Sequence, residues 1–232
     1  MAQALVTGAN RGIGLEFTRQ LLARGDRVIA TCRDQGRALE LTRLAGEYPG
    51  HLKVLPLDVT APRSIAELVR EVETLDLRID LLINNAGVLP SGERFGELDA
   101  ATLAATFETN VIGPVLLTQA LAGLLVDGGK VVALGSRLGS IEYTKSFGTP
   151  SYAISKAAAH MAMRLLGHAL AERSIAVVAI SPGWVRTDMG GANANLGVDE
   201  SVQAMLATID GVRFDAGAVG LLLGHDGEVL DW

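Results

Sequence analysis

The chain has 232 residues, of which 49% are hydrophobic and 20% charged, and its net charge is −6. This composition is typical of a globular protein and excludes a disordered chain. The acidic balance argues against nucleic acid or an anionic membrane as a partner, so we expect neither. The single cysteine, Cys32, cannot form an internal disulfide, and no uninterrupted apolar run reaches the ~18 residues of a spanning helix. We therefore expect a soluble cytoplasmic protein.

Short apolar, β-branched segments alternate with amphipathic segments along the whole chain. In chain order the expected strands are 3–7, 27–32, 52–57, 79–84, 129–135 and 175–180, with a weaker seventh near 219–223 or 228–231. The expected helices are 13–24, 36–47, 63–75, 98–109, 112–126, 151–172 and 199–210. Most strand segments are apolar without alternation, as expected where both faces of a sheet are covered. The pattern predicts an α/β fold with a doubly wound, mostly parallel sheet in one domain, 1–232.

Three irregular segments follow predicted strands, at 87–97, 137–150 and 183–198. In open α/β sheets, ligands bind outside the carboxyl ends of the strands. We therefore expect these loops to build a substrate pocket. The small residues of 190–197 suit either a mobile lid or a flexible connector, and the sequence does not decide between them.

Glycines follow the first predicted strand in the segment Thr7-Gly8-Ala9-Asn10-Arg11-Gly12-Ile13-Gly14. Glycines between a strand and a helix allow a tight turn, a close approach of backbone to a pyrophosphate, and a helix N-terminus directed at the anion. The spacing is G-x-x-x-G-x-G and not G-x-G-x-x-G, but the mechanism is the same. Glycines also simply turn chains, yet their place directly after the first strand favours a nucleotide cofactor. The residues expected to bind it are Gly8, Asn10, Arg11, Gly12, Ile13 and Gly14.

A tyrosine and a lysine stand four residues apart in Tyr152-Ala153-Ile154-Ser155-Lys156. On a helix, side chains with this spacing lie on one face. An ammonium beside a phenol lowers the pKa of the phenol from its usual value of about 10. We therefore expect Tyr152 to act as a general acid or base. The same spacing is common on solvated helices, but the nucleotide motif in the same domain favours the chemical interpretation.

Four motifs of the chain resemble those of the short-chain dehydrogenase/reductase family, in order and spacing. They are Thr7-Gly8-x-x-x-Gly12-x-Gly14, Asn84-Asn85-Ala86-Gly87, Tyr152-x-x-x-Lys156 and Pro182-Gly183. The resemblance covers the whole chain and implies a Rossmann-type seven-stranded sheet and NAD(P)-dependent oxidoreduction. The small size and the segment 226–232 look similar to the family's C-factor-like carbonyl reductases. One departure is Gly135-Ser136, which stands where the family usually has two serines.

The resemblance implies a catalytic group of four residues. Tyr152 would donate the proton, and Lys156 would lower the pKa of Tyr152 and hold the nicotinamide ribose. Ser136 would hydrogen-bond the carbonyl oxygen, with Ser140 as a second candidate that could equally close a loop turn. Asn110 would help to position Lys156 through water, or would only satisfy the backbone at a helix kink.

Further cofactor contacts are implied by the same resemblance. Asp58 and Val59 would contact the adenine, although an Asp there could equally cap the following helix. The segment Asn84–Gly87 would stabilise the sheet and line the cofactor site, and the turn after the sixth strand would contact the nicotinamide carboxamide. The additional residues expected to bind the cofactor are Asn85, Ala86, Gly87, Pro182, Gly183, Val185 and Thr187.

The charges near the end of the second strand favour NADP(H) over NAD(H). In proteins that bind NAD, a carboxylate at this position accepts hydrogen bonds from the ribose hydroxyls. Here Cys32 stands at that position, with Arg33 next to it. The guanidinium of Arg33 suits a phosphate, and Arg11 is a second candidate. Asp34 is counter-evidence unless it caps the following helix.

Together these features predict an NADPH-dependent carbonyl reductase or alcohol dehydrogenase. The residues expected to wall the pocket favour a neutral aldehyde or ketone, since most are apolar: Leu89, Leu138, Tyr143, Trp184 and Met189. One alternative is an NADP-binding sensor or signalling protein with little turnover. A nucleotide-sugar epimerase is a further alternative, but the chain after Pro182 is short for its substrate domain.

Assembly and metal binding are less strongly indicated. Small residues on the predicted helix 151–172, together with the resemblance, imply a homodimer or homotetramer formed through this helix and 98–126: Ala157, Ala158, Ala159, Ala162 and Ala169. His160 and His168 have no further ligands at metal spacing. We therefore expect no metal site and place both histidines at the surface or at an interface.

Overall fold

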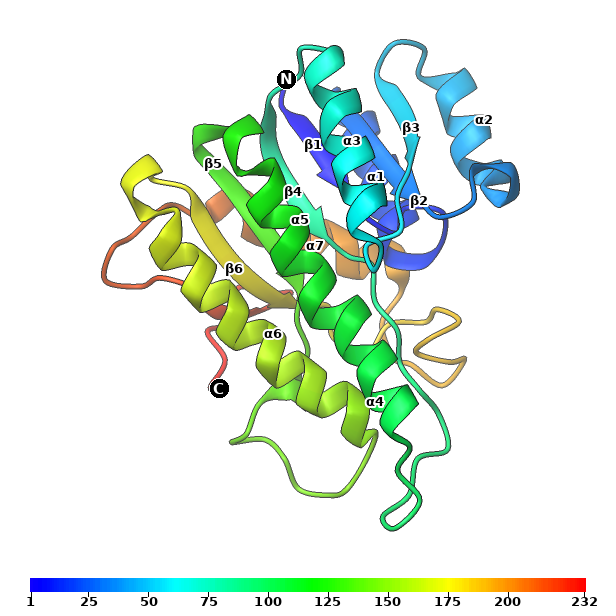
Figure 1. Cartoon of the computed structure of the whole chain (residues 1–232), viewed down its shortest axis with the longest axis vertical. Coiled ribbons are helices and arrows are strands. Elements are labelled where there is room, and N and C mark those ends of the chain that lie inside the picture. Colours follow the sequence, from blue (N-terminus) through cyan, green and yellow to red (C-terminus); the bar gives the residue numbers. More distant parts are fainter.

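A seven-stranded sheet forms the middle of the molecule (Figure 1). The computed structural model describes residues 1–232. The strands are β1 (Gln3–Val6), β2 (Arg27–Cys32), β3 (Leu52–Pro56), β4 (Ile79–Asn84), β5 (Leu125–Leu134), β6 (Ala176–Ser181) and β7 (Leu222–Gly224). They lie in the order β3-β2-β1-β4-β5-β6-β7, and every neighbouring pair is parallel. The predicted α/β fold with a doubly wound parallel sheet is therefore confirmed.

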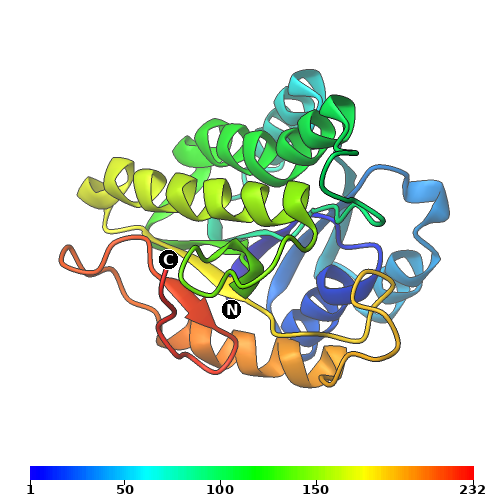
Figure 2. The ribbon, with the colours of Figure 1, turned by 90° about the horizontal axis from the view of Figure 1, so that it is seen from below.

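Helices cover both faces of this sheet (Figure 2). The helices are α1 (Gly12–Ala23), α2 (Leu39–Glu47), α3 (Pro62–Thr74), α4 (Ala100–Phe107), α5 (Gly113–Leu121), α6 (Pro150–Ala169) and α7 (Val198–Gly211). Helices α1, α2 and α7 lie on one face, and α3, α4, α5 and α6 lie on the other (Figure 2). Single turns of 3₁₀ helix lie at Gln35–Arg37, Ala122–Leu124, Arg137–Gly139 and Ala171–Arg173.

Successive side chains of one strand enter different cores. In β4, Ile83 packs into the core under α1, α2 and α7, whereas Leu82 packs into the core under α3, α5 and α6. In β1, Val6 and Leu5 divide in the same way. Because side chains alternate across a strand and both faces are covered, most positions in the middle of a central strand are apolar. This is why the strands lack an alternating pattern in the sequence.

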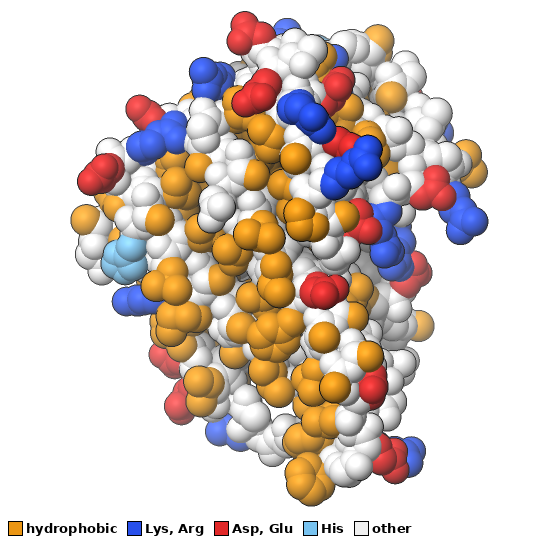
Figure 3. Space-filling model, in the orientation of Figure 1, with side chains coloured by type: hydrophobic (Ala, Val, Ile, Leu, Met, Phe, Trp, Pro, Cys, Tyr) orange, Lys and Arg blue, Asp and Glu red, His pale blue; other side chains and the backbone are white.

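The helices expected at 98–109 and 112–126 form one continuous helical segment, Ala100–Leu124, whose middle is a π-helical turn, Glu108–Ile112. By length and composition alone this segment is apolar enough to cross a membrane. Polar residues such as Glu108 interrupt it, so it contains no long uninterrupted apolar run. Here it packs on the sheet through Leu117 and Leu121. Its outer side adds to an apolar surface that extends over α4, α5 and α6 (Figure 3).

The seventh strand is expected in one of two ranges, 219–223 or 228–231. It occupies Leu222–Gly224, at the end of the first of the two expected ranges. The second range does not add a parallel strand, because the chain reverses at Gly227, where φ is +86°. It returns antiparallel to β7, with Val229 opposite Leu223. The last residues are thereby brought back toward the carboxyl end of β5.

The strand order creates one crevice at the edge of the sheet. Strands β1, β2 and β3 succeed one another in one direction, and β4 to β7 in the other, so the direction reverses between β1 and β4. At such a switch point the following loops diverge and leave a crevice outside the carboxyl ends of the strands. The glycine segment after β1 and the Asn85–Gly87 segment after β4 meet at this point.

Candidate active site

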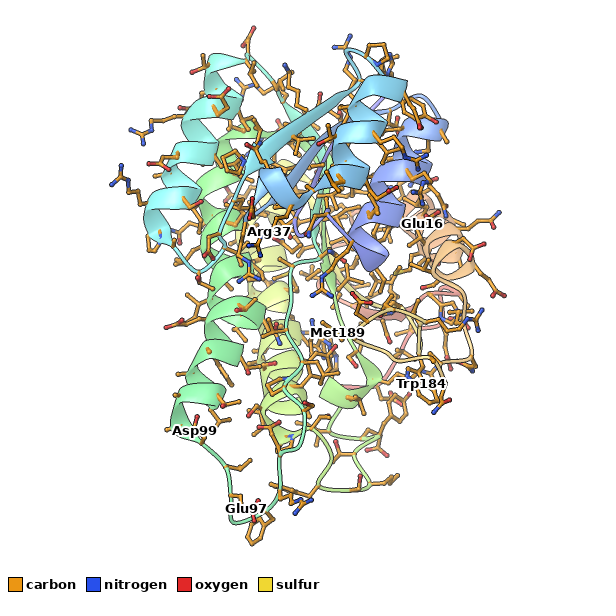
Figure 4. All side chains as sticks on the ribbon, turned by 90° about the vertical axis from the view of Figure 1, so that its right-hand side faces the viewer. Glu16, Arg37, Glu97, Asp99, Trp184 and Met189 are labelled. Atoms are coloured by element: carbon orange, nitrogen blue, oxygen red, sulfur yellow. The ribbon has the colours of Figure 1, made fainter.

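A cleft of about 780 Å³ lies at the carboxyl ends of the central strands. Most of the residues expected to bind a cofactor line it: Gly8, Asn10, Arg11, Gly12, Ile13, Arg33, Asp58, Val59, Asn85, Ala86, Gly87, Tyr152, Lys156, Pro182 and Thr187. Arg37 and Met189 also line the cleft, and both face the viewer in Figure 4. Gly14, Gly183, Val185, Asn110 and Ser136 are not part of its lining but lie in the segments that form it.

The glycine segment is a backbone cradle in which Gly8 and Gly14 leave no room for a side chain. Gly8 has a φ of +63°, and a Cβ there would lie 3.0 Å from Ala86 Cα. A Cβ on Gly14 would collide with the Gly8 carbonyl oxygen and with Asn85 Nδ2. Helix α1 begins at Gly12, so its N-terminus faces the cleft. This arrangement fits a pyrophosphate, because free N–H groups and the helix dipole both favour an anion there.

Asn85 joins the two segments that meet at the switch point. Its Nδ2 donates to the carbonyl oxygens of Thr7, at 2.8 Å, and Gly8, at 3.1 Å. In return, Thr7 Oγ1 accepts from the backbone N–H groups of Asn85 and Ala86, at 3.0 and 2.9 Å. The Asn85–Gly87 segment therefore has a structural role in addition to lining the cleft.

Tyr152 and Lys156 project from one face of α6, and Ser136 follows β5. The Lys156 side chain is buried, and its Nζ donates to the Leu134 carbonyl oxygen at 2.7 Å. The same Nζ lies 5.4 Å from the centroid of the Tyr152 ring. The Ser136 side chain lies close enough to the Tyr152 hydroxyl to influence the pKa of the phenol. The structure thus brings together three of the four expected catalytic residues.

The pKa of Tyr152 shifts in the direction opposite to the one expected from the sequence. Burial raises the pKa of Tyr152, and the nearby Ser136 side chain opposes this shift only in part. Burial also lowers the pKa of Lys156 to about 8. The expected lowering of the Tyr152 pKa by Lys156 is therefore wrong for this structure. The physical reason is desolvation: the environment that hides the phenol from water disfavours its charged form.

Asn110 lies in the π-helical turn and is almost fully buried. Its Oδ1 accepts from the Val88 N–H at 2.9 Å, and its Nδ2 donates to the Val88 carbonyl oxygen at 2.9 Å and to Ser155 Oγ at 3.0 Å. It therefore joins the loop after β4 to helix α6. Asn110 Oδ1 and Lys156 Nζ both lie close to Gly87, because a Cβ built on this glycine would be 3.3 Å from the first atom and 3.9 Å from the second. Asn110 thus satisfies backbone groups at a helix irregularity and also lies beside the lysine.

The end of β2 carries two arginines whose charge is only partly compensated. Arg33 is exposed and lines the cleft. Asp34 Oδ1 accepts from the Gly36 N–H at 3.0 Å, and Asp34 Oδ2 lies 3.3 Å from Arg37 Nε. Asp34 therefore caps the short helix Gln35–Arg37, which is the role in which it does not count against NADP(H). The sequence analysis missed Arg37, although its spacing of three residues from Asp34 is typical of an ion pair.

Asp58 is bound by its own turn. Its Oδ1 accepts from the backbone N–H of Thr60 at 2.9 Å and from Thr60 Oγ1 at 2.7 Å, and these bonds lower the pKa of Asp58. Helix α3 begins at Pro62, so this turn leads into it. The neighbouring Val59 is buried at the wall of the cleft.

The loop after β6 closes one side of the cleft. Val185 is buried and pairs with Leu196, and Gly183 packs against His225. Arg11 Nη1 lies 2.8 Å from Asp188 Oδ2, so an exposed ion pair joins the glycine segment to this loop. Exposed ion pairs contribute little free energy, and Arg11 can therefore exchange Asp188 for another anion.

Three further expectations have clear outcomes. Ser140 Oγ accepts from the Tyr143 N–H at 3.3 Å. This bond lies within a turn, as expected if Ser140 closes the loop. Trp184 is 56% exposed, and its Nε1 donates to the Gly190 carbonyl oxygen at 2.8 Å. The expected surface or interface position of His160 is wrong, because only 1% of this residue is exposed, whereas His168 is exposed. Helical periodicity explains the burial of His160: it follows Lys156 by four residues and shares its inward face.

Comparison with known proteins identifies the family. Residues 2–195 match the family described as short chain dehydrogenase. The chain belongs to this family. Among curated relatives, the C-signal of Myxococcus xanthus is 37% identical over 156 residues, which cover 66% of this chain and 93% of the C-signal.

Solved structures of carbonyl reductases share the whole fold. The carbonyl reductase Sniffer of D. melanogaster is 31% identical, with a TM-score of 0.94 and complete coverage of both chains. The NADPH-bound carbonyl reductase from chicken fatty liver is 36% identical, with a TM-score of 0.92, and the match covers 100% of this chain and 99% of that one. The resemblance found in the sequence, including its narrower part, is therefore confirmed.

Proposed function

We propose that this member of the family is an NADP(H)-dependent reductase of aldehydes or ketones, which can also oxidise the corresponding alcohols. The observation that carries the proposal is that Tyr152 and Lys156, with Lys156 Nζ 5.4 Å from the Tyr152 ring, line the same cleft as the glycine cradle. The similarity to carbonyl reductases, one of them NADPH-bound, supports the same activity. An intact proton-transfer group has no physical use in a protein that only binds a nucleotide, and this argues against the sensor alternative.

A bound nicotinamide cofactor would supply or accept the hydride. The cradle of Gly8, Gly12 and Gly14 would hold its pyrophosphate, because glycines let the backbone approach the anion closely at the N-terminus of α1. Lys156 lies at the far side of the cleft from Arg33 and would hold the nicotinamide ribose. Pro182 and Thr187 also line the cleft, and they would contact the nicotinamide end of the cofactor.

Tyr152 would donate the proton that a carbonyl oxygen needs when it becomes an alkoxide. Since burial raises the pKa of Tyr152, the phenol is protonated at neutral pH and can act as the acid. Ser136 Oγ accepts a hydrogen bond from the Leu138 N–H at 3.1 Å. The serine's own proton is therefore free to be directed at the same carbonyl oxygen, where it would stabilise the developing negative charge.

A preference for NADP(H) is supported by the two arginines after β2. Arg33 and Arg37 would bind the 2′-phosphate, which an uncompensated carboxylate would repel. Asp34 does not oppose this, because one of its oxygens caps the short helix and the other pairs with Arg37.

A neutral carbonyl compound is the substrate class that the loops favour. Leu138, Trp184 and Met189 are 53, 56 and 44% exposed, and they come from two of the three loops that were expected to build the pocket. Of these three, Met189 lines the cleft, and exposed apolar side chains gain free energy when a ligand covers them.

Helices α4, α5 and α6 also present an apolar surface, which we propose to be covered by a second copy of the chain. The exposed side chains include Ile112, Ile154, Met161 and Leu165, and apolar atoms dominate this face (Figure 3). Scattered apolar residues are normal at a surface, but a continuous group over neighbouring helices is typical of an interface. A monomer mass by light scattering at micromolar concentration would contradict the proposed dimer or tetramer.

A cytoplasmic location is also part of the proposal. The single cysteine, Cys32, is buried and forms no disulfide, as is usual for proteins of a reducing compartment.

Replacing Tyr152 by Phe tests the reductase proposal. We expect carbonyl-dependent oxidation of NADPH, measured with a panel of aldehydes, ketones and quinones, to fall at least about 100-fold, because the proton donor is lost. The dissociation constant for NADPH should change little, since the ring remains. Tyr143→Phe is the matched control, and we expect it to retain most of the activity. Equal turnover in the wild type and Tyr152→Phe would contradict the role of Tyr152.

Replacing Arg33 by Ala tests the cofactor preference. We expect the dissociation constant for NADPH to rise by about tenfold or more, because a charge-assisted hydrogen bond to the phosphate is lost. Binding of NADH, measured by the same fluorescence titration, should stay nearly constant. If both cofactors lose affinity equally, the 2′-phosphate is not the group that Arg33 binds.

A further inference from the structure

His160 contacts the backbone of the catalytic serine. The imidazole is buried, and its Nε2 accepts from the Ser136 N–H at 3.3 Å. His160 follows Tyr152 by eight residues and Lys156 by four, so all three project from the same side of α6. Two of them bind the chain at the end of β5, Lys156 through the Leu134 carbonyl and His160 through the Ser136 amide, and the Tyr152 hydroxyl lies near the Ser136 side chain.

The imidazole is suited to accept and not to donate in this contact. Burial, and to a lesser extent the charge of Lys156, lowers the pKa of His160 to about 4. The ring is therefore neutral at physiological pH, and the proton belongs on Nδ1, since Nε2 is the acceptor. Nδ1 is buried and has no hydrogen-bond partner. The hydrogen bond that Nε2 accepts is therefore the only one that the ring makes. The buried Nδ1 donor without a partner costs free energy.

Gly135 leaves the space that the imidazole occupies. A Cβ on Gly135 would lie 3.0 Å from His160 Nε2 and 3.0 Å from Leu222 Cδ1. Both contacts are closer than ordinary van der Waals distance, so a serine at this position would push the ring away from the Ser136 amide. This gives a physical reason for the one departure from the family pattern in this segment: the residue before the catalytic serine is glycine, and the histidine approaches through the gap.

The other end of the imidazole is backed by the last residues of the chain. The Trp232 ring lies 5.9 Å from the His160 ring, centroid to centroid. The Trp232 carbonyl oxygen accepts from the Glu142 N–H at 3.1 Å, and Glu228 Oε2 lies 2.6 Å from Arg137 Nη2. The segment 228–232 thus contacts both the histidine and the loop that follows Ser136.

We propose that His160 is a positioning residue for carbonyl reduction: by accepting the Ser136 amide proton, it fixes the direction in which the Ser136 hydroxyl points at the substrate oxygen. The hydroxyl direction depends on the backbone at Ser136, because the Oγ atom is only one rotatable bond away from it. The other hydrogen bond of this hydroxyl, from the Leu138 N–H, lies in the loop itself, whereas His160 ties the serine to the rigid helix that carries Tyr152. The proposal rests on the proposed function, because it assumes that Ser136 contacts the carbonyl oxygen.

A double-mutant cycle separates positioning from general stabilisation. His160→Phe removes the acceptor and keeps a ring, and His160→Gln retains an acceptor of similar reach. His168→Phe, an exposed position on the same helix, is the control and should leave activity unchanged. We expect His160→Phe to lower kcat by about tenfold, since a buried N–H loses its partner, and His160→Gln to restore most of it. In the Ser136→Ala background, His160→Phe should change kcat less than about twofold, because its effect acts through the serine.

The outcomes distinguish the two proposals. If Ser136→Ala keeps full turnover, the proposed role of the serine fails and the role of His160 fails with it. If Ser136→Ala is impaired but His160→Phe lowers kcat equally in both backgrounds, only the role of His160 is overturned. Circular dichroism and the NADPH dissociation constant show whether each variant is folded. If His160→Phe is unfolded, Gly135→Ala replaces it in the cycle: a loss of kcat that disappears in the Ser136→Ala background supports the proposal, and full kcat contradicts it.

Discussion

The buried ammonium of Lys156 is the interaction on which the site depends. A charge inside a protein is costly, and here the Leu134 carbonyl at 2.7 Å compensates for part of the lost hydration. Because this carbonyl lies at the end of β5, the contact fixes helix α6 against the sheet at the position of the lysine. Tyr152 lies one turn before it and His160 one turn after it, so the same contact aligns both with Ser136. The lowered pKa of Lys156, about 8, is the cost of this arrangement.

The rest of the fold brings a nucleotide cradle to this helix face. The reversal of strand direction between β1 and β4 opens the crevice, and the hydrogen bonds of Asn85 close the glycine segment against it. Asn110 then ties the loop after β4 to α6, so hydrogen bonds connect the glycine segment, through the loop after β4, to the helix that carries Tyr152. Apolar side chains of the loops after β5 and β6 are exposed, among them Leu138, Trp184 and Met189. Under the proposed function, the core would therefore carry the chemistry and cofactor binding, and these loops would carry substrate choice.

The sequence predicted the sheet, the glycine turn after β1 and the approach of Tyr152 and Lys156 to the cleft, because each depends on local pattern or on motif spacing. It could not predict what depends on packing. The π-helical turn that points Asn110 inward leaves no signal in composition, and the burial of His160 requires knowing which face of α6 meets β5. The pKa of Tyr152 was misjudged for the same reason, since the spacing of Tyr152 and Lys156 says nothing about desolvation. Arg37 was missed although its spacing from Asp34 was visible.

The most direct test of the central claim is a titration of the Tyr152 phenol. The chain has only three tyrosines, so the difference in ultraviolet absorbance between the wild type and Tyr152→Phe isolates one phenol. Burial favours the protonated form, and we therefore expect this phenol to ionise above the ordinary value of about 10, consistent with a proton donor that is intact at neutral pH. Ionisation well below that value in the protein without nucleotide would contradict the claim, because Tyr152 would then be a phenolate held by Lys156.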